Sequence, residues 1–160
     1  MNPLDLVTLL SALGSALIAG SFFAFSTFVM RALGKLPPPA GVAAMQSINV
    51  AVINPWFMTP FVGTAALSAI ATAAALVRWS EPGAGYVLAG AVLYLAGTFL
   101  VTMVCNVPLN DALAKANPSS AEAAGLWAAY LSTWTAWNHV RAAAALAALA
   151  SFVTAFRLRG

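Results

Sequence analysis

The sequence predicts an all-α integral membrane protein. We expect an antiparallel four-helix bundle with short amphipathic helices in its first and third connections. Two observations predict this class. Of the 160 residues, 62% are hydrophobic and only 7% are charged, whereas soluble domains carry roughly 25% charged residues. The few charges also separate four uncharged stretches, each long enough to cross a bilayer. We therefore expect a single membrane domain over residues 1–160.

The four membrane spans are predicted at about residues 4–30, 54–77, 83–107 and 134–156. Each contains the roughly 20 apolar residues that a bilayer core requires. Backbone groups in lipid must be paired within their own segment, so each span should be a helix. The second span should start at Asn54, because asparagine is a good N-cap and the following proline suits the first helical position. Four spans place both chain termini on one side.

The two connections on the other side are longer than turns. The first, residues 30–53, carries a proline cluster followed by an expected short helix over residues 42–52. The second, residues 106–133, carries an expected short helix over about residues 120–133, where Ser120 and Glu122 resemble a capping signal. Function is expected at this more elaborate end. Positive charges divide equally between the two sides, so the membrane orientation stays open.

The composition of the chain argues against several kinds of partner and cofactor site. The formal net charge of +3 is small and scattered, so nucleic acid is not an expected partner. The single cysteine, Cys105, excludes an intramolecular disulfide and a metal site built from several thiolates. The lone His139 disfavours a metal centre with several histidines, and we expect no metal or cofactor. A haem remains an alternative, because it needs only one proximal histidine.

A polar and aromatic cluster precedes the alanine-rich end of the fourth span. On a helix that turns about 100° per residue, six side chains share one stripe: Trp127, Tyr130, Trp134, Trp137, Asn138 and Arg141. His139 falls nearly opposite them. Ionisable groups within membrane segments usually face the bundle interior and mark function. The alternative is that the aromatic residues anchor the helix at the interface.

Two further polar groups lie at the same membrane face. Asn106 and Asn110 are four residues apart around Pro108. They either end the helix or direct two carboxamides into a pocket. Gln46 and Asn49 belong to the expected short helix of the first connection. Convergence of amides, an arginine and indoles at one end of an apolar bundle predicts a pocket for an aromatic or amphipathic small molecule.

Five motifs resemble those of the anthrone-oxygenase-like family of small membrane proteins, much of which is catalogued as a domain of unknown function. They are Met45–Asn49, Asn54–Phe57, Asn106–Asn110, Trp127-x-x-Tyr130 and Trp134-x-x-Trp137-Asn138-His139-x-Arg141. The resemblance covers nearly the whole chain. It implies oxidation of an aromatic, anthrone-like compound by molecular oxygen without an evident cofactor. It also implies a bacterial inner (plasma) membrane location.

The resemblance also implies roles for individual residues. As catalytic residues we expect His139 as the base, Arg141 as the group that stabilises the enolate, and Asn138 as a ligand of substrate oxygens. As substrate-binding residues we expect Gln46, Asn49, Asn54, Asn106, Asn110, Tyr130 and Trp134, the last stacking on the ring. Two other functions remain open: a non-catalytic module that binds a lipid, quinone or partner protein, and a haem-binding membrane protein. A homo-oligomer is also compatible with the sequence.

Overall fold

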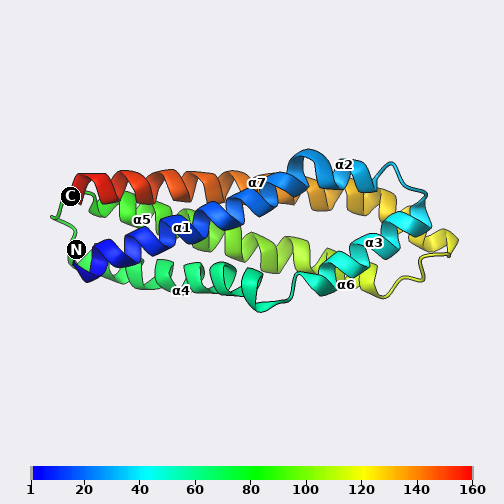
Figure 1. Ribbon diagram of the computed structural model, residues 1–160, viewed down its shortest axis with the longest axis horizontal. Helices are drawn as coiled ribbons and strands as arrows, with labels where there is room; N and C mark the ends of the chain where they lie inside the picture. Colours follow the sequence, from blue (N-terminus) through cyan, green and yellow to red (C-terminus); the bar gives the residue numbers. More distant parts are fainter. Residues whose placement is uncertain (1, 160) are drawn as a thin grey trace.

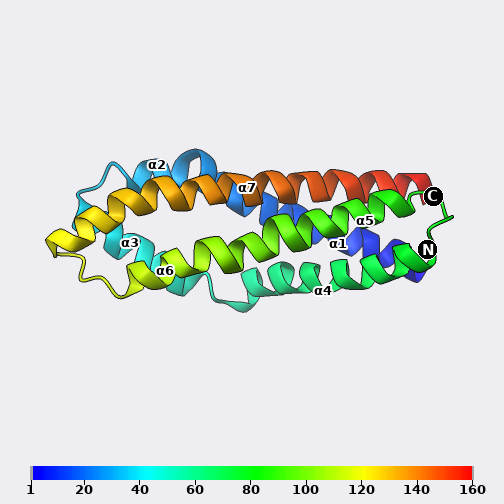
Figure 2. The same cartoon turned by 180° about the vertical axis from the view of Figure 1, so that it is seen from behind.

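Helices that run side by side form an elongated antiparallel bundle, with both termini at one end (Figures 1 and 2). The computed structural model describes residues 2–159, and within them every regular element is helical. In chain order the elements are α1 (Pro3–Ala24), η1 (Phe25–Val29), α2 (Met30–Leu33), α3 (Pro38–Ala51), α4 (Pro55–Val77), α5 (Ala84–Val92), η2 (Leu93–Leu100), η3 (Thr102–Asn106), α6 (Val107–Ala114) and α7 (Ala121–Arg159). The predicted all-α bundle is confirmed.

Four helical segments are long and apolar enough to cross a membrane: Pro3–Leu33, Pro55–Val77, Ala84–Ala114 and Ala121–Arg159. They correspond in order to the four predicted spans. The protein is therefore an integral membrane protein. The first, third and fourth segments are longer than a hydrocarbon core of about 30 Å requires. Together with α3 they extend the bundle beyond the start of α4, at the end opposite the termini (Figure 1).

The fourth segment differs from the prediction in one respect. The expected short helix at residues 120–133 and the expected span at 134–156 are one continuous helix, α7. Ser120 accepts a hydrogen bond from the Ala123 N–H at 3.1 Å at its start, and no proline interrupts it. Without a break, the predicted stripe extends along α7, and its members are buried except Trp137, which is 39% exposed.

The third segment also passes the point where an end was expected. Pro108 has no N–H to donate to a helical ladder and commonly ends a helix. Here the π-helical turn η3 precedes it, with Val107 N–H bonded to the carbonyl of Thr102, and the chain stays helical through α6 to Ala114. Such widened turns accommodate local misfits within a helix and frequently occur at functional sites.

Helices α3 and α4 meet at a break over residues 52–54, which we call the elbow (Figure 1). Asn54 stabilises it from both sides. Its Oδ1 accepts from the Phe57 N–H at 3.2 Å, and its Nδ2 donates to the Ala51 carbonyl at 2.8 Å. The predicted N-cap of the second span is thus confirmed. Helix α3 begins at Pro38, four residues before the expected start, because proline suits the first helical position.

The end of the bundle that holds the termini is closed by ion pairs. Arg159, whose side chain is 4% exposed, donates from Nε to Asp5 Oδ1 at 3.0 Å, and its Nη2 lies 2.9 Å from Glu81 Oε2. These contacts join the end of α7 to the start of α1 and to the turn between α4 and α5.

The conformation of Gly83, in that turn, allows a prediction about stability. Its φ of 78° is left-handed, and an added Cβ would lie 2.9 Å from the carbonyl oxygen of Ala155. We expect Gly83→Ala to lower the free energy of unfolding in detergent by about 2 kcal/mol, since the left-handed conformation alone costs an L-residue about 1–2 kcal/mol. Gly85→Ala is the matched control. It is helical, and the nearest atom is 4.0 Å from its Cβ, so this variant should be neutral or more stable. The opposite order of stability would contradict the conformational argument.

Candidate functional site

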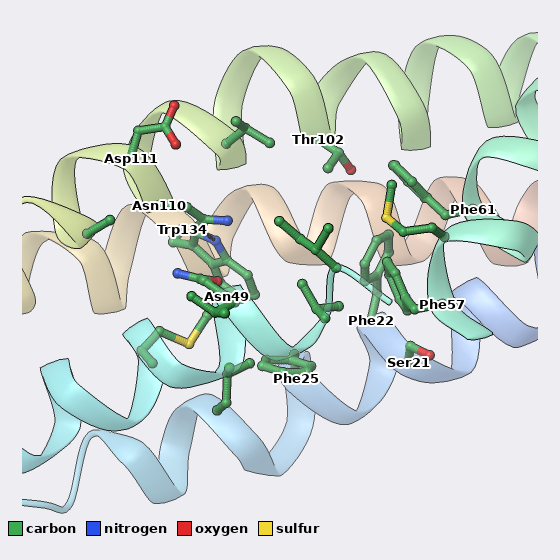
Figure 3. Close-up of a pocket in the computed structure, with 18 of the residues that line it drawn as sticks. Ser21, Phe22, Phe25, Asn49, Phe57, Phe61, Thr102, Asn110, Asp111 and Trp134 are labelled. Carbon is green, nitrogen blue, oxygen red and sulfur yellow. Dashed lines mark hydrogen bonds between the residues drawn. The ribbon is translucent and has the colours of Figure 1, made fainter. Parts of the chain in front are cut away.

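A cavity of about 650 Å³ lies between α1, η1, α3, α4, η3, α6 and α7, next to the elbow. This volume is within the range of small-molecule sites. Figure 3 shows Asn49, Asn110 and Trp134 at one end of the pocket, and Phe22, Phe57 and Phe61 at the other. The pocket is thus mostly aromatic and apolar, with a small set of polar groups.

Arg141 forms part of the pocket wall although it is only 5% exposed. Its Nε and Nη2 donate to Asn138 Oδ1 at 3.0 and 2.8 Å, and its Nη1 donates to Thr102 Oγ1 at 3.3 Å. The guanidinium carbon lies 3.9 Å from the ring centroid of Phe22 and 4.8 Å from that of Trp134. These rings stabilise the cation through their π-electrons.

Among the described residues, no carboxylate pairs with the charge of Arg141. Within residues 2–159, the ion pairs involve Arg78 and Arg159 but not Arg141. Buried charges are normally paired, because removing them from water is costly. Three of the five guanidinium N–H groups are occupied by the bonds to Asn138 and Thr102. The wall of the pocket therefore carries a buried cation with donors to spare, which suits an anionic oxygen.

Asn138 holds this arginine in place. Its Nδ2 donates to the carbonyl of Phe22 at 2.8 Å and to Ser26 Oγ at 2.7 Å, while its Oδ1 accepts from Arg141. Asn138 is fully buried and is not among the pocket-lining residues. The structure places it behind Arg141 as a positioning residue, whereas we had expected it to bind substrate oxygens.

Asn110 organises the other end of the pocket. Its Oδ1 accepts from the Tyr130 hydroxyl and from Trp134 Nε1, both at 2.8 Å. The rings of Trp127, Tyr130 and Trp134 are stacked, with centroids 5.6 and 5.8 Å apart along the series. Asn106 Nδ2 donates to the carbonyl of Trp134 at 3.1 Å. Tyr130 and Asn106 thus support the wall from behind.

Helix α3 covers the pocket on the side away from the termini. Gln46 Nε2 donates to the carbonyls of Leu113 and Ala116 at 2.8 and 2.9 Å, which ties α3 to the end of α6. Asn49 lines the pocket, and its buried Nδ2 has no hydrogen-bond partner among the described residues.

The sequence of this site has a match among known protein families. A model of the anthrone oxygenase family matches residues 55–151, which is more than half of the chain. The chain belongs to the anthrone oxygenase family. The match runs from α4 through most of α7, so it includes Asn110, Asn138 and Arg141. A search of curated proteins and a search of solved structures each find no match.

The structure divides the predicted site residues of this anthrone oxygenase family member into three groups. Those that line the pocket are Gln46, Asn49, Asn110, Trp134 and Arg141. Those that support it from behind are Asn106, Tyr130 and Asn138. Asn54 and His139 are not among the residues that line this pocket. Asn54 caps α4, as described above.

His139 is exposed on the outer side of α7, one helical step of about 100° from the buried Asn138. The helical-wheel analysis already placed it opposite the stripe, and the role of base has no geometric support. A haem bound through His139 would lie outside the pocket. Within residues 2–159, no three histidine, cysteine or acidic side chains converge as a metal site.

The pocket of this family member also contains residues that sequence reasoning missed. Phe22, Phe25 and Thr102 contact Arg141 or Trp134, but in the sequence they are ordinary members of apolar helices. Asp111 also lines the pocket. It directly follows Asn110, and this position could have identified it as a candidate.

Proposed function

We propose that this protein oxidises a lipophilic, anthrone-like aromatic ketone with molecular oxygen, and that Arg141 stabilises the enolate of the substrate. The observation that carries the proposal is the buried guanidinium, which has no carboxylate partner within residues 2–159, at the wall of an aromatic cavity. The family match supports the same reaction class. The bacterial plasma membrane is the proposed location.

The proposed reaction balances without a further reactant. The substrate ring CH2 loses one proton and becomes an enolate. Oxygen accepts electrons from this carbon and forms a C–O bond, which gives a hydroperoxide after protonation. Loss of water, with the second hydrogen of the carbon, leaves a ketone. Overall, one CH2 and one O2 become one C=O and one H2O.

The protein contributes electrostatics and exclusion of water. The free N–H donors of Arg141 would bind the oxygen on which the enolate charge develops, where preorganised donors have their largest effect. Phe22 and Trp134 lie against the guanidinium, so they shield this contact from water. The face of Trp134 also offers a surface on which a planar ring can stack.

We propose Asp111 as the group that accepts the first proton. It is a carboxylate within the pocket lining, and Gln46, Asn49 and Asn110 near it are neutral amides. A positioned carboxylate can act as a general base. This assignment replaces the one we had made for His139, whose side chain lies outside the pocket.

Oxygen uptake by the purified protein tests the reaction. With anthrone as substrate, we expect equimolar consumption of oxygen and formation of anthraquinone, above the uncatalysed rate. Asp111→Asn should lower the rate by about 100-fold, the lower end of typical general-base contributions. Glu122→Gln, at the start of α7 and outside the pocket lining, is the matched control and should be unaffected. An uncatalysed rate with wild-type protein contradicts the proposal. Anthrone binding without turnover favours a non-catalytic binding module instead.

A further inference from the structure

The depth of the pocket in the membrane follows from exposed aromatic residues. Trp56, 91% exposed, lies at the start of α4, and Trp79, 59% exposed, follows its end. Tryptophan gathers at membrane interfaces. The 23 residues of α4 rise about 35 Å in total, at 1.5 Å per residue, which suits a hydrocarbon core of about 30 Å with an interface at each side. The elbow therefore lies at the interface opposite the termini.

The pocket lies at this same depth. Arg141 is about 27 Å along α7 from Arg159, and Phe22 is about 28 Å along α1 from Pro3, at the standard helical rise. Arg159 and Pro3 belong to the end of the bundle where Asp5 and Glu81 pair with Arg159. Arg141 is thus close to the far membrane interface, where a cation costs less than at the bilayer centre.

Packed side chains close any route from water through the end of the bundle opposite the termini. Beyond the pocket, the core contains Met30, Val42, Leu113, Trp127 and Tyr130, each at most 4% exposed. Met45, 1% exposed, lies between this core and the pocket. The two bonds of Gln46 tie α3 to α6 across this end. A ligand entering in this direction would have to separate α3 from the core.

The mouth of the pocket opens to the side instead. Among its lining residues, Val50 is 74% exposed, Ile53 is 72% exposed and Met103 is 40% exposed. They come from the end of α3, the elbow and η3. Helix α3 packs against α6, and α4 packs against η2, so the elbow falls between these two contacts. Exposed apolar side chains at the interface depth would lie against lipid rather than water.

We infer that the substrate reaches the pocket laterally from the bilayer interface, through a mouth between the elbow and η3. The inference rests on the proposed aromatic ligand, and it narrows the substrate class. The substrate is a membrane-partitioned planar ketone whose carbonyl oxygen can carry the enolate charge, and its ring passes Val50, Ile53 and Met103. Asp111, also in the lining and exposed, gives this mouth one polar side.

The rate of ligand binding in lipid nanodiscs tests the lateral mouth. The probe is anthraquinone under argon, followed by quenching of tryptophan fluorescence after rapid mixing. We expect the double variant Val50→Phe/Met103→Phe to slow association and dissociation by about tenfold each, or about 1.4 kcal/mol of added barrier. The equilibrium constant should change little, because a narrowed mouth affects both directions. Val153→Phe, exposed on α7 and outside the pocket lining, is the control and should bind at the wild-type rate.

A second probe distinguishes the routes. Anthraquinone sulfonate has the same ring but stays in water, and we expect it to associate much more slowly than anthraquinone. Equal rates for the two probes, or unchanged rates in the double variant, would overturn the inference.

The two proposals can fail separately. Binding is measured with the oxidised product and without oxygen, so a lateral mouth can be demonstrated in a protein that turns over no anthrone. That outcome would contradict only the proposed function. Absence of anthraquinone binding to the wild-type protein would overturn both the mouth and the proposed function.

Discussion

Arg141→Met is expected to lower kcat/KM for anthrone oxidation by about 100- to 1,000-fold, which is the effect of removing one preorganised oxyanion donor. Methionine keeps most of the length and the apolar contacts of the side chain. It removes the positive charge and the free N–H donors beside Phe22 and Trp134. The enolate would then form against a neutral aromatic wall. Oxygen uptake with anthrone measures the effect.

The same substitution should affect stability less than activity. Arg141 has no ion pair within residues 2–159, so its removal leaves no unpaired carboxylate. It does remove the two donors to Asn138 Oδ1, and one unsatisfied buried acceptor costs about 1–3 kcal/mol. A drop in activity that merely follows the loss of folded protein would argue against a role in the reaction.

Two variants serve as controls for the charge. Arg157→Met lies on the same helix at an exposed position and should keep full activity. Arg141→Lys keeps a positive charge but loses the planar fork that bonds Asn138 twice, so its activity should fall between those of the wild type and Arg141→Met. If Arg141→Met is as active as Arg157→Met, an anionic intermediate at this position is excluded.

Asn138→Leu is expected to have the second large effect, lowering the free energy of unfolding by about 3 kcal/mol. The side chain joins α7 to α1 through the Phe22 carbonyl and to η1 through Ser26 Oγ, and it holds Arg141. Leucine leaves these buried groups without partners, and each unsatisfied group costs about 1–3 kcal/mol. Unfolding in detergent measures the change. Thr133→Leu, exposed on the same helix, is the control and should be near neutral.

Asn138→Asp tests whether the charge of Arg141 must stay free. The carboxylate keeps an acceptor for Arg141 and adds a negative charge, so the guanidinium gains an ion pair. It also loses the Nδ2 donor to the Phe22 carbonyl, so activity is compared at equal amounts of folded protein. We expect the new carboxylate to pair with Arg141. The variant should then lose most of its activity, because the cation is neutralised before substrate arrives. If Asn138→Asp is as active as the wild type, the free positive charge of Arg141 is not required for the reaction.

Much of the site could be predicted from the sequence, because the relevant signals are local. The stripe on α7 follows from helical periodicity, and it correctly grouped Trp134, Asn138 and Arg141 on a buried face while turning His139 outward. The cap at Asn54 follows from its side-chain chemistry next to a proline. Such features depend on residues within a few positions of one another.

Other features could not be predicted from residues that are neighbours in the sequence. The widened turn before Pro108 lets the third segment continue as a helix, and whether a proline ends or only distorts a helix depends on what packs around it. The position of Asn138 behind Arg141 and that of Asp111 in the pocket lining could not be predicted for the same reason. Both positions depend on how other helices pack.

The sequence alone determined the membrane class, the number of spans, the family resemblance and the polar stripe of α7, since charge content and periodicity are properties of the chain itself. Only the tertiary structure decided which stripe members reach the pocket. Asn138 bonds a carbonyl 116 positions earlier in the chain, at Phe22, and α3 closes a cavity whose opposite wall belongs to α7. These contacts depend on how the helices pack, and no local pattern specifies which distant backbone group a buried amide will meet.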